Sequence, residues 1–287
     1  MKQLILWLGV LGGSTAAVFI RWSTAPSLVL VAYRMFFAVL LLLPAAVRHR
    51  GEFSEISQKT LLLCVCSGVA LGLHFAAYFE AVKTTSIVAS SVLVDMEVLF
   101  VALAGVLIFH KPIPIGGWLS IFLALGGAVT IALADTAGGG GTNALLGDAL
   151  ALLASALMGV YTMLGGACRK RVSTTVYTYL VYFVAMLTVL VLTAVDGAPL
   201  FGYGAVNFAT AFGMAVCCTL LGHSIFSWCL KYLSPSVVST TRLMDCVFGV
   251  VWSLLIFGER PGFPVFLGGG MIILGVILYG RIAARED

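Results

Sequence analysis

Long apolar runs constrain the fold of this chain more than any other feature of its sequence. A helix of about 20 apolar residues crosses the hydrocarbon core of a bilayer, and the 287 residues divide almost completely into runs of that length. Short segments with charges or turn residues separate the runs, for example KPIP at 111–114 and SPS at 234–236. We therefore predict an all-α membrane protein with ten transmembrane helices. They are expected at about residues 4–20, 28–47, 60–81, 86–108, 115–135, 147–168, 175–195, 207–230, 236–257 and 264–281.

The composition excludes several classes of function. Only 10% of the residues are charged and 61% are hydrophobic, so a soluble catalytic domain does not fit and an enzyme is not expected. The net charge of +4 is small, and nucleic acid is not expected as a partner. The seven cysteines lie in or next to apolar runs without a zinc-binding spacing. We interpret them as core residues and predict no metal and no cofactor.

The positive charges predict the orientation in the membrane. With the N-terminus in the cytoplasm, most Lys and Arg residues of the loops are cytoplasmic, and Arg21, Lys83 and Arg260 are external. We therefore expect both termini in the cytoplasm. The first apolar run follows Lys2 and is as long as the later runs, so we expect a retained helix rather than a signal peptide.

The two halves of the chain repeat one pattern at an offset of 148 residues. MEVLFVALAGVLIFHK in the first half matches MDCVFGVVWSLLIFGE in the second, and Glu97 aligns with Asp245. Because each half holds five helices, an odd number, the halves must have opposite orientations. We predict an inverted repeat with its substrate site between the halves. The expected units are residues 1–135 and 147–287, joined by an extracellular glycine-rich linker at 136–146.

Charged residues inside the apolar runs are the first candidates for the site. The segment RLMDCVF contains Arg242 and Asp245, and a charge at the bilayer centre costs about 3 kcal/mol unless it faces protein or water. These two residues are one helical turn apart and can pair. Asp95 and Glu97 would point about 200° apart on a continuous helix, so at most one of them is expected to face a central cavity directly.

The functional interpretation is that Glu97 and Asp245 flank a polar pathway. Arg34 and Arg242 would be displaced toward opposite sides of the membrane, so that a zwitterion finds partners of both signs. The structural alternative is that these charges pair internally and only fix the helix packing.

Polar and aromatic residues add to the candidate pathway. His74 and Tyr78 share one helix face, and His223 and Ser227 share the corresponding face in the second half. Tyr161 could stack against an aromatic side chain of a substrate. For each residue the alternative is an ordinary packing or interfacial role.

Several motifs carry a resemblance to a known family. Each half ends in LIFHKP or LIFGERP followed by a glycine-rich helix, and LGGSTAAVFIR and Arg34 lie near the start. In these features the chain resembles the drug/metabolite transporter superfamily, in its ten-helix EamA-type branch. It is similar in size and layout to bacterial amino-acid exporters, including those of the YddG kind for aromatic amino acids. The resemblance implies a secondary transporter of the bacterial cytoplasmic membrane that exports amino acids or similar small zwitterions.

Other functions stay open at this stage. The substrate could instead be a nucleotide-linked, cationic or acyl-carrying metabolite, and a receptor or assembly subunit without transport is a further alternative. Protons are a candidate coupling ion through Glu97 or Asp245. The partners expected are the lipid bilayer and a small molecule, and the fused halves favour a monomer. Glycine clusters at 126–127 and 268–270 are expected to allow close helix packing, with a dimer interface as the alternative.

Overall fold

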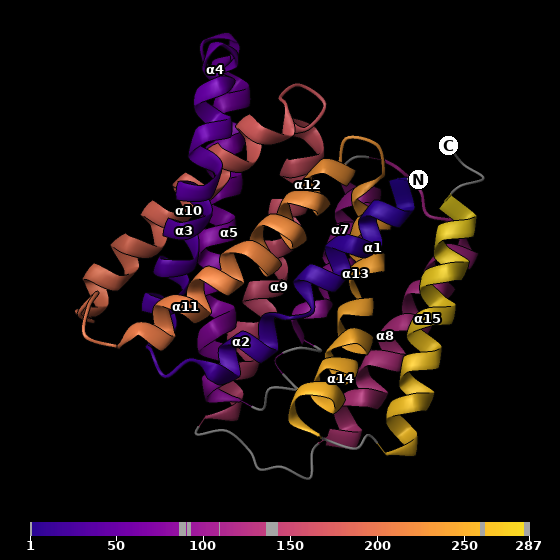
Figure 1. Ribbon diagram of the computed structural model, residues 1–287. Coiled ribbons are helices and arrows are strands. Elements are labelled where there is room, and N and C mark those ends of the chain that lie inside the picture. The colour runs from indigo at the N-terminus through magenta and orange to yellow at the C-terminus, as the bar shows by residue number, and fades with distance from the viewer. Residues whose placement is uncertain are drawn as a thin grey trace.

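The chain folds into a bundle of helices (Figure 1). The computed structural model describes residues 2–85, 90, 93–108, 110–135, 143–258 and 262–283, and these ranges contain no strand. Eight helical segments there are long and apolar enough to cross a membrane. The other two predicted spans contain the apolar helices α7 and α8. The all-α membrane fold is therefore confirmed. Arg260 and residues 136–142 of the predicted linker lie outside the described residues.

The helices have the following bounds: α1 Lys2–Gly13, α2 Ala16–Trp22, α3 Ser27–Arg48, α4 Arg50–Glu55, α5 Gln58–Thr84, α7 Glu97–Leu107, α8 Ile115–Asp135, α9 Ala144–Cys168, α10 Thr174–Asp196, α11 Ala205–Met214, a π-helix at Ala215–Ser224, α12 Ile225–Cys229, α13 Pro235–Arg242, α14 Met244–Phe257 and α15 Phe263–Ala283.

Polar side chains fix where several spans begin. Ser57, Ser173 and Ser234 each accept a hydrogen bond from the backbone N–H three residues further on, at the starts of α5, α10 and α13. Asn143 does the same at the start of α9. Such caps satisfy backbone donors that have no partner inside the helix. They therefore place each helix start at the point where the apolar run begins.

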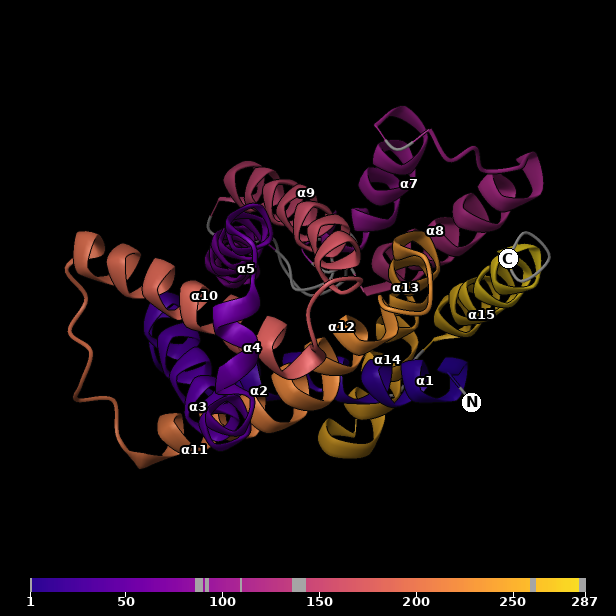
Figure 2. The same ribbon diagram turned by 90° about the horizontal axis from the view of Figure 1, so that it is seen from above.

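The helix contacts follow the two-fold relation of the halves. The third helix of the first half, α5, packs on the first helix of the second half, α9. The related contact joins α1 to the π-helix and α12. Two further pairs join equivalent helices directly, α3 with α10 and α8 with α15, and these pairs lie on opposite sides of the bundle (Figure 2).

The ends of the chain support opposite orientations of the halves. The N- and C-terminal ends lie at the same end of the bundle, and α8 ends and α9 begins at the other end (Figure 1). The second half therefore starts from the opposite face, as an inverted repeat of five helices requires.

Four of the predicted spans are interrupted, which the apolar pattern did not predict. The first span breaks at Ser14–Thr15, and the eighth contains the π-helix. The fourth and ninth spans turn at Met96 and Leu243, where i→i−3 backbone hydrogen bonds replace the α-helical ones. The last two breaks lie at nearly equivalent positions of the repeat. Interrupted helices near the membrane midplane are typical of transporters, because the freed backbone and the side chains beside it can line a site.

Two glycines at equivalent positions let α8 and α15 pack closely. A Cβ atom on Gly275 would lie 2.6 Å from the carbonyl oxygen of Ser120. A Cβ atom on Gly127 would collide with the carbonyl oxygen of Gly268. These contacts lie within the bundle, as expected from the glycine clusters, and they leave no room for any larger residue.

We expect Gly127→Ala to lower the stability of the fold by about 1–3 kcal/mol, because the added methyl group forces two backbones apart. Thermal unfolding of the purified protein in detergent measures the change. The matched control is Gly270→Ala in α15, where a Cβ atom meets nothing within 4 Å. Equal unfolding midpoints for the two variants would contradict this packing.

Candidate functional site

An ion pair joins the two halves where their fourth helices are broken. Glu97 is the first residue of α7 and Arg242 is the last residue of α13. The Arg242 Nη1 atom donates to Glu97 Oε2 at 2.7 Å, with 5% of the Glu97 side chain and 16% of the Arg242 side chain exposed. The hydroxyl of Thr162 in α9 donates to Glu97 Oε1 at 2.7 Å. Both carboxylate oxygens of Glu97 are therefore satisfied.

This arrangement differs from the pairing of Arg242 with Asp245 that the spacing suggested. That spacing assumes one continuous helix, whereas the turn at Leu243 separates α13, which carries Arg242, from α14, which carries Asp245. Arg242 instead pairs across the repeat with Glu97.

The remaining carboxylates lie beside the same breaks. The thiol of Cys246 donates to Asp95 Oδ2 at 2.7 Å. Asp245 lies against Gly13 at the end of α1, where a Cβ atom would be 3.3 Å from Asp245 Oδ2. Asp245 Oδ1 is buried and has no hydrogen-bond partner among the described residues. The turn at Met96 also explains why Asp95 and Glu97 both contact the second half, despite the divergence expected on a continuous helix.

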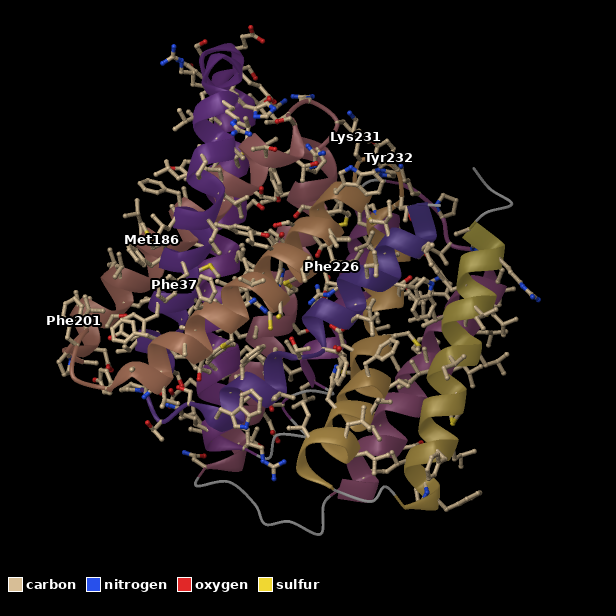
Figure 3. All side chains as sticks on the ribbon, in the orientation of Figure 1. Phe37, Met186, Phe201, Phe226, Lys231 and Tyr232 are labelled. Carbon is tan, nitrogen blue, oxygen red and sulfur yellow. The ribbon has the colours of Figure 1, made fainter. Side chains whose placement is uncertain are left out.

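Arg34 is buried against the π-helix. Only 2% of its surface is exposed, and its Nε atom donates to the hydroxyl of Thr219 at 2.8 Å. The guanidinium carbon lies 4.2 Å from the centre of the Phe75 ring. Arg242 similarly lies 5.2 Å from the ring centre of Phe226, which is in the middle of the bundle (Figure 3). Contacts of this kind stabilise a desolvated cation.

The predicted polar and aromatic residues form a connected group. His74 Nδ1 donates to the carbonyl oxygen of Ala154 at 2.8 Å, and the His74 ring stacks on Tyr78 with centroids 6.1 Å apart. The hydroxyl groups of Tyr161 and Ser227 share a hydrogen bond of 2.9 Å.

His223 connects this group to the charged residues. It lies in the π-helix and packs edge-on against Phe75, Tyr161 and Phe226. Its Nδ1 atom is buried without a partner in the described part of the chain. Through Phe75 and Phe226 it reaches Arg34 and Arg242.

All ten predicted site residues therefore lie in one contiguous cluster at the interface of the halves.

Several residues that hold the charges in place were not predicted from the sequence. Phe75 and Thr162 directly follow the predicted residues His74 and Tyr161, but neighbours in a helix point about 100° apart, so adjacency did not identify them. Gly13 lies in the motif LGGSTAAVFIR, which marks this stretch, whereas Thr219 carries no signal because its role depends on the π-helix. The residues missed are Gly13, Phe75, Thr162, Thr219, Phe226 and Cys246.

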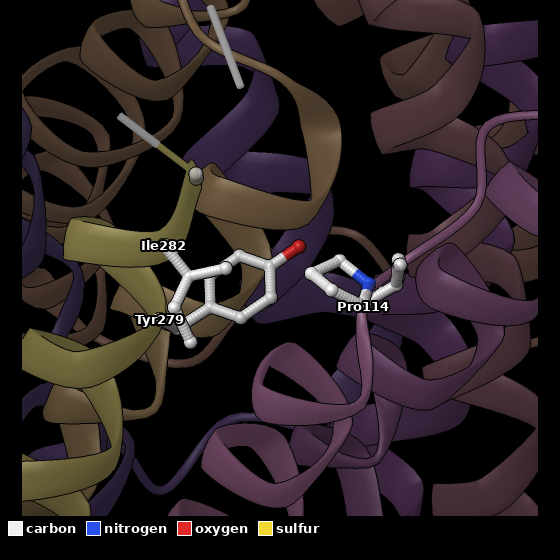
Figure 4. A pocket seen from close by; sticks show the side chains of 5 residues that line it. Pro114, Tyr279 and Ile282 are labelled. Carbon is white, nitrogen blue, oxygen red and sulfur yellow. The ribbon is translucent and has the colours of Figure 1, made fainter. Parts of the chain in front are cut away.

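Side chains cover this cluster. Arg34, Glu97 and His223 are 2%, 4% and 7% exposed. The hollow in Figure 4 lies elsewhere, between the start of α8 and the end of α15, and none of the site residues lines it. Within the described residues, no group of three His, Cys, Asp or Glu side chains could hold a metal ion. The chemistry that the cluster offers is recognition of charge and of aromatic or apolar surface.

Comparisons with known proteins agree with this architecture. The model of the EamA-like transporter family matches residues 3–133 and 145–281. An uncharacterized transporter of Archaeoglobus fulgidus is 23% identical over 87% of this chain and 86% of its own length. The pseudopaline exporter CntI of Pseudomonas aeruginosa is 23% identical over 90% of this chain and 88% of its own. A solved crystal structure superposes with a TM-score of 0.79 at 16% identity, covering 100% of this chain and 98% of that one.

We expect Glu97→Gln to lower stability by about 3–5 kcal/mol, because it leaves the Arg242 charge buried without its counter-charge. The double variant Glu97→Gln/Arg242→Gln should be less destabilised than the sum of the single variants, which denaturant unfolding in detergent can measure. Glu80→Gln, at an exposed carboxylate of α5, is the matched control. Additive effects would show that the two side chains act independently.

Proposed function

This chain belongs to the EamA-like transporter family, and from that membership we propose that it exports amino acids or similar small zwitterionic metabolites across a bacterial cytoplasmic membrane. One observation carries the proposal: side chains of both signs from both halves meet at helix breaks inside the bundle. A zwitterion needs a guanidinium for its carboxylate and a carboxylate for its ammonium group. The name of the Pseudomonas aeruginosa relative, an exporter, supports outward transport.

Two hydrogen bonds between the halves support alternating access as the mechanism. The backbone N–H of Ser173 donates to Glu52 Oε1 of α4. The backbone N–H of Ala25 donates to Asn207 Oδ1 of α11 at 3.1 Å. Ala25 and Ser173 are equivalent in the repeat, since they are 148 residues apart. We call these two contacts the fastenings.

The fastenings lie at opposite ends of the bundle. Figure 1 shows α4 at the end where the chain termini lie, whereas α11 starts near the other end. Each fastening joins a residue of one half to a residue of the other half. We propose that opening one while the other stays closed exposes the central cluster to one side of the membrane at a time, with the residue 1–135 and 147–287 units moving against each other.

We expect Asn207→Ala to speed backbone hydrogen exchange in residues 23–25, because the Asn207 amide accepts from the N–H groups of Thr24 and Ala25. Exchange at Ser173 should not change. Glu52→Ala should act in the opposite way, because it removes the acceptor of the Ser173 N–H group, speeding exchange at Ser173 and leaving Ala25 unchanged. Hydrogen exchange read by mass spectrometry distinguishes the two ends. A change at both ends in either variant would contradict independent fastenings.

Counterflow in proteoliposomes tests the transport proposal. Vesicles preloaded with one unlabelled amino acid should take up the same labelled compound, and Asp245→Asn should slow the exchange at least about tenfold, since one lost charged interaction is worth about 1.5–3 kcal/mol. Asp196→Asn, at an exposed carboxylate at the end of α10, is the control. Folded wild-type protein that exchanges no aromatic, aliphatic, acidic or basic amino acid would refute the proposed substrate class. A pH gradient across the same vesicles tests protons as the coupling ion.

A further inference from the structure

Arg34 differs from the other buried arginines in what its terminal nitrogens contact. Arg242 donates through Nη1 to Glu97. Arg169, which is also 2% exposed, donates through its terminal nitrogens to the carbonyl oxygen of Val172 and the hydroxyl of Thr174. Arg34 makes its hydrogen bond through Nε, to Thr219. Among the described residues, no hydrogen bond or ion pair reaches its two terminal nitrogens.

A buried guanidinium without an anion is costly. Removing such a charge from water costs several kcal/mol, and a nearby carboxylate is the usual compensation. The face of Phe75 and the hydroxyl of Thr219 offset part of that cost. Neither supplies a negative charge. The local chemistry is therefore complementary to an anion that the chain itself does not provide.

The contacts of Arg34 also fix its orientation. The Nε hydrogen bond to Thr219 holds one edge of the guanidinium, and the Phe75 ring covers one face. Four N–H donors remain on the two terminal nitrogens, and the parallel pair at the end of the guanidinium matches the two oxygens of a carboxylate. His223 packs on the same Phe75 ring, and its Nδ1 atom also has no hydrogen-bond partner among the described residues. Two unsatisfied polar groups therefore flank one aromatic ring.

A short chain of contacts joins Arg34 to Asp245 through the break between α1 and α2. Thr15 hydrogen-bonds Cys218 at 3.4 Å, and Cys218 precedes the Thr219 that holds Arg34. Gly13, two residues before Thr15, lies against Asp245. Arg34 is thus linked through Thr219, Cys218 and Thr15 to the helix break against which Asp245 lies.

We propose that the terminal nitrogens of Arg34 bind the carboxylate of the substrate and that Asp245 binds its ammonium group, while Arg242 stays paired with Glu97 as a structural ion pair. This assignment rests on the proposed function and deepens it, because it divides the charged cluster into a substrate-binding pair and a packing pair.

Three ligands with the same aromatic ring separate the two subsites. Phenylalanine carries both charges, 3-phenylpropanoate carries only the carboxylate, and phenethylamine carries only the ammonium group. Their binding to purified full-length protein is measured by thermal stabilisation. Arg34→Gln should weaken binding of phenylalanine and 3-phenylpropanoate at least tenfold and leave phenethylamine unchanged. Arg48→Gln, at an exposed arginine of the same helix, should bind all three ligands as the wild type does.

Two further variants test the assignment if the Arg34→Gln protein does not fold. Arg34→Lys keeps the charge but not the paired donors, and Thr219→Val releases the guanidinium from its fixed orientation. Both should weaken binding of 3-phenylpropanoate more than binding of phenethylamine.

The assignment would be overturned if Arg34→Gln bound 3-phenylpropanoate as tightly as the wild type does. It would also be overturned if the wild-type protein bound neither 3-phenylpropanoate nor hexanoate, which is a carboxylate without an aromatic ring. The proposed function fails separately. Wild-type protein without amino-acid counterflow but with Arg34-dependent binding of 3-phenylpropanoate would keep the anion subsite and refute the amino-acid substrate.

Discussion

The ion pair between Arg242 and Glu97 is the interaction on which the centre of this bundle depends. Both side chains are largely buried, so each requires the other as its counter-charge. The pair is possible only because equivalent helices of the two halves approach each other at the interface, and α7 and α13 are in contact there. Thr162 then connects the pair to α9. The charges thereby fix the relative positions of three helices.

The broken helices follow from the same constraint. A continuous α-helix satisfies its own backbone and presents side chains at fixed angles. The turns at Met96 and Leu243 change these angles, so that Asp95 meets Cys246 and Glu97 meets Arg242 across the interface. The π-helix similarly places His223 against Phe75 and Tyr161. Irregular backbone is thus concentrated where the polar side chains gather, in agreement with the rule that non-helical backbone in a membrane must be buried in protein or line a polar space.

The sequence predicted the fold well and the site only in outline. Apolar run lengths and the repeat pattern are properties of many residues together, so the all-helical architecture and the inverted halves could be inferred from them. The membership of the site residues in one cluster also followed from the repeat. The partner of Arg242 could not be inferred from the sequence, because helical spacing cannot reveal a break that tertiary contacts impose. For the same reason Thr219, which acts through the π-helix, had no signal in the sequence.

The backbone donors of the two fastenings are equivalent in the repeat, but their acceptors are chemically unequal. Glu52 offers a half-buried carboxylate in the first turn of α4, whereas the Asn207 amide is buried and has further hydrogen bonds to Ser23, Thr24 and Tyr203. Two identical halves would give inward-open and outward-open forms of equal free energy. Here a difference of about 1.4 kcal/mol between the fastenings would be enough for a tenfold population bias toward one form. Under the proposed alternating-access mechanism, a few residues at the rims of the bundle would set the resting orientation, and divergence at those residues could change it without altering the proposed substrate site.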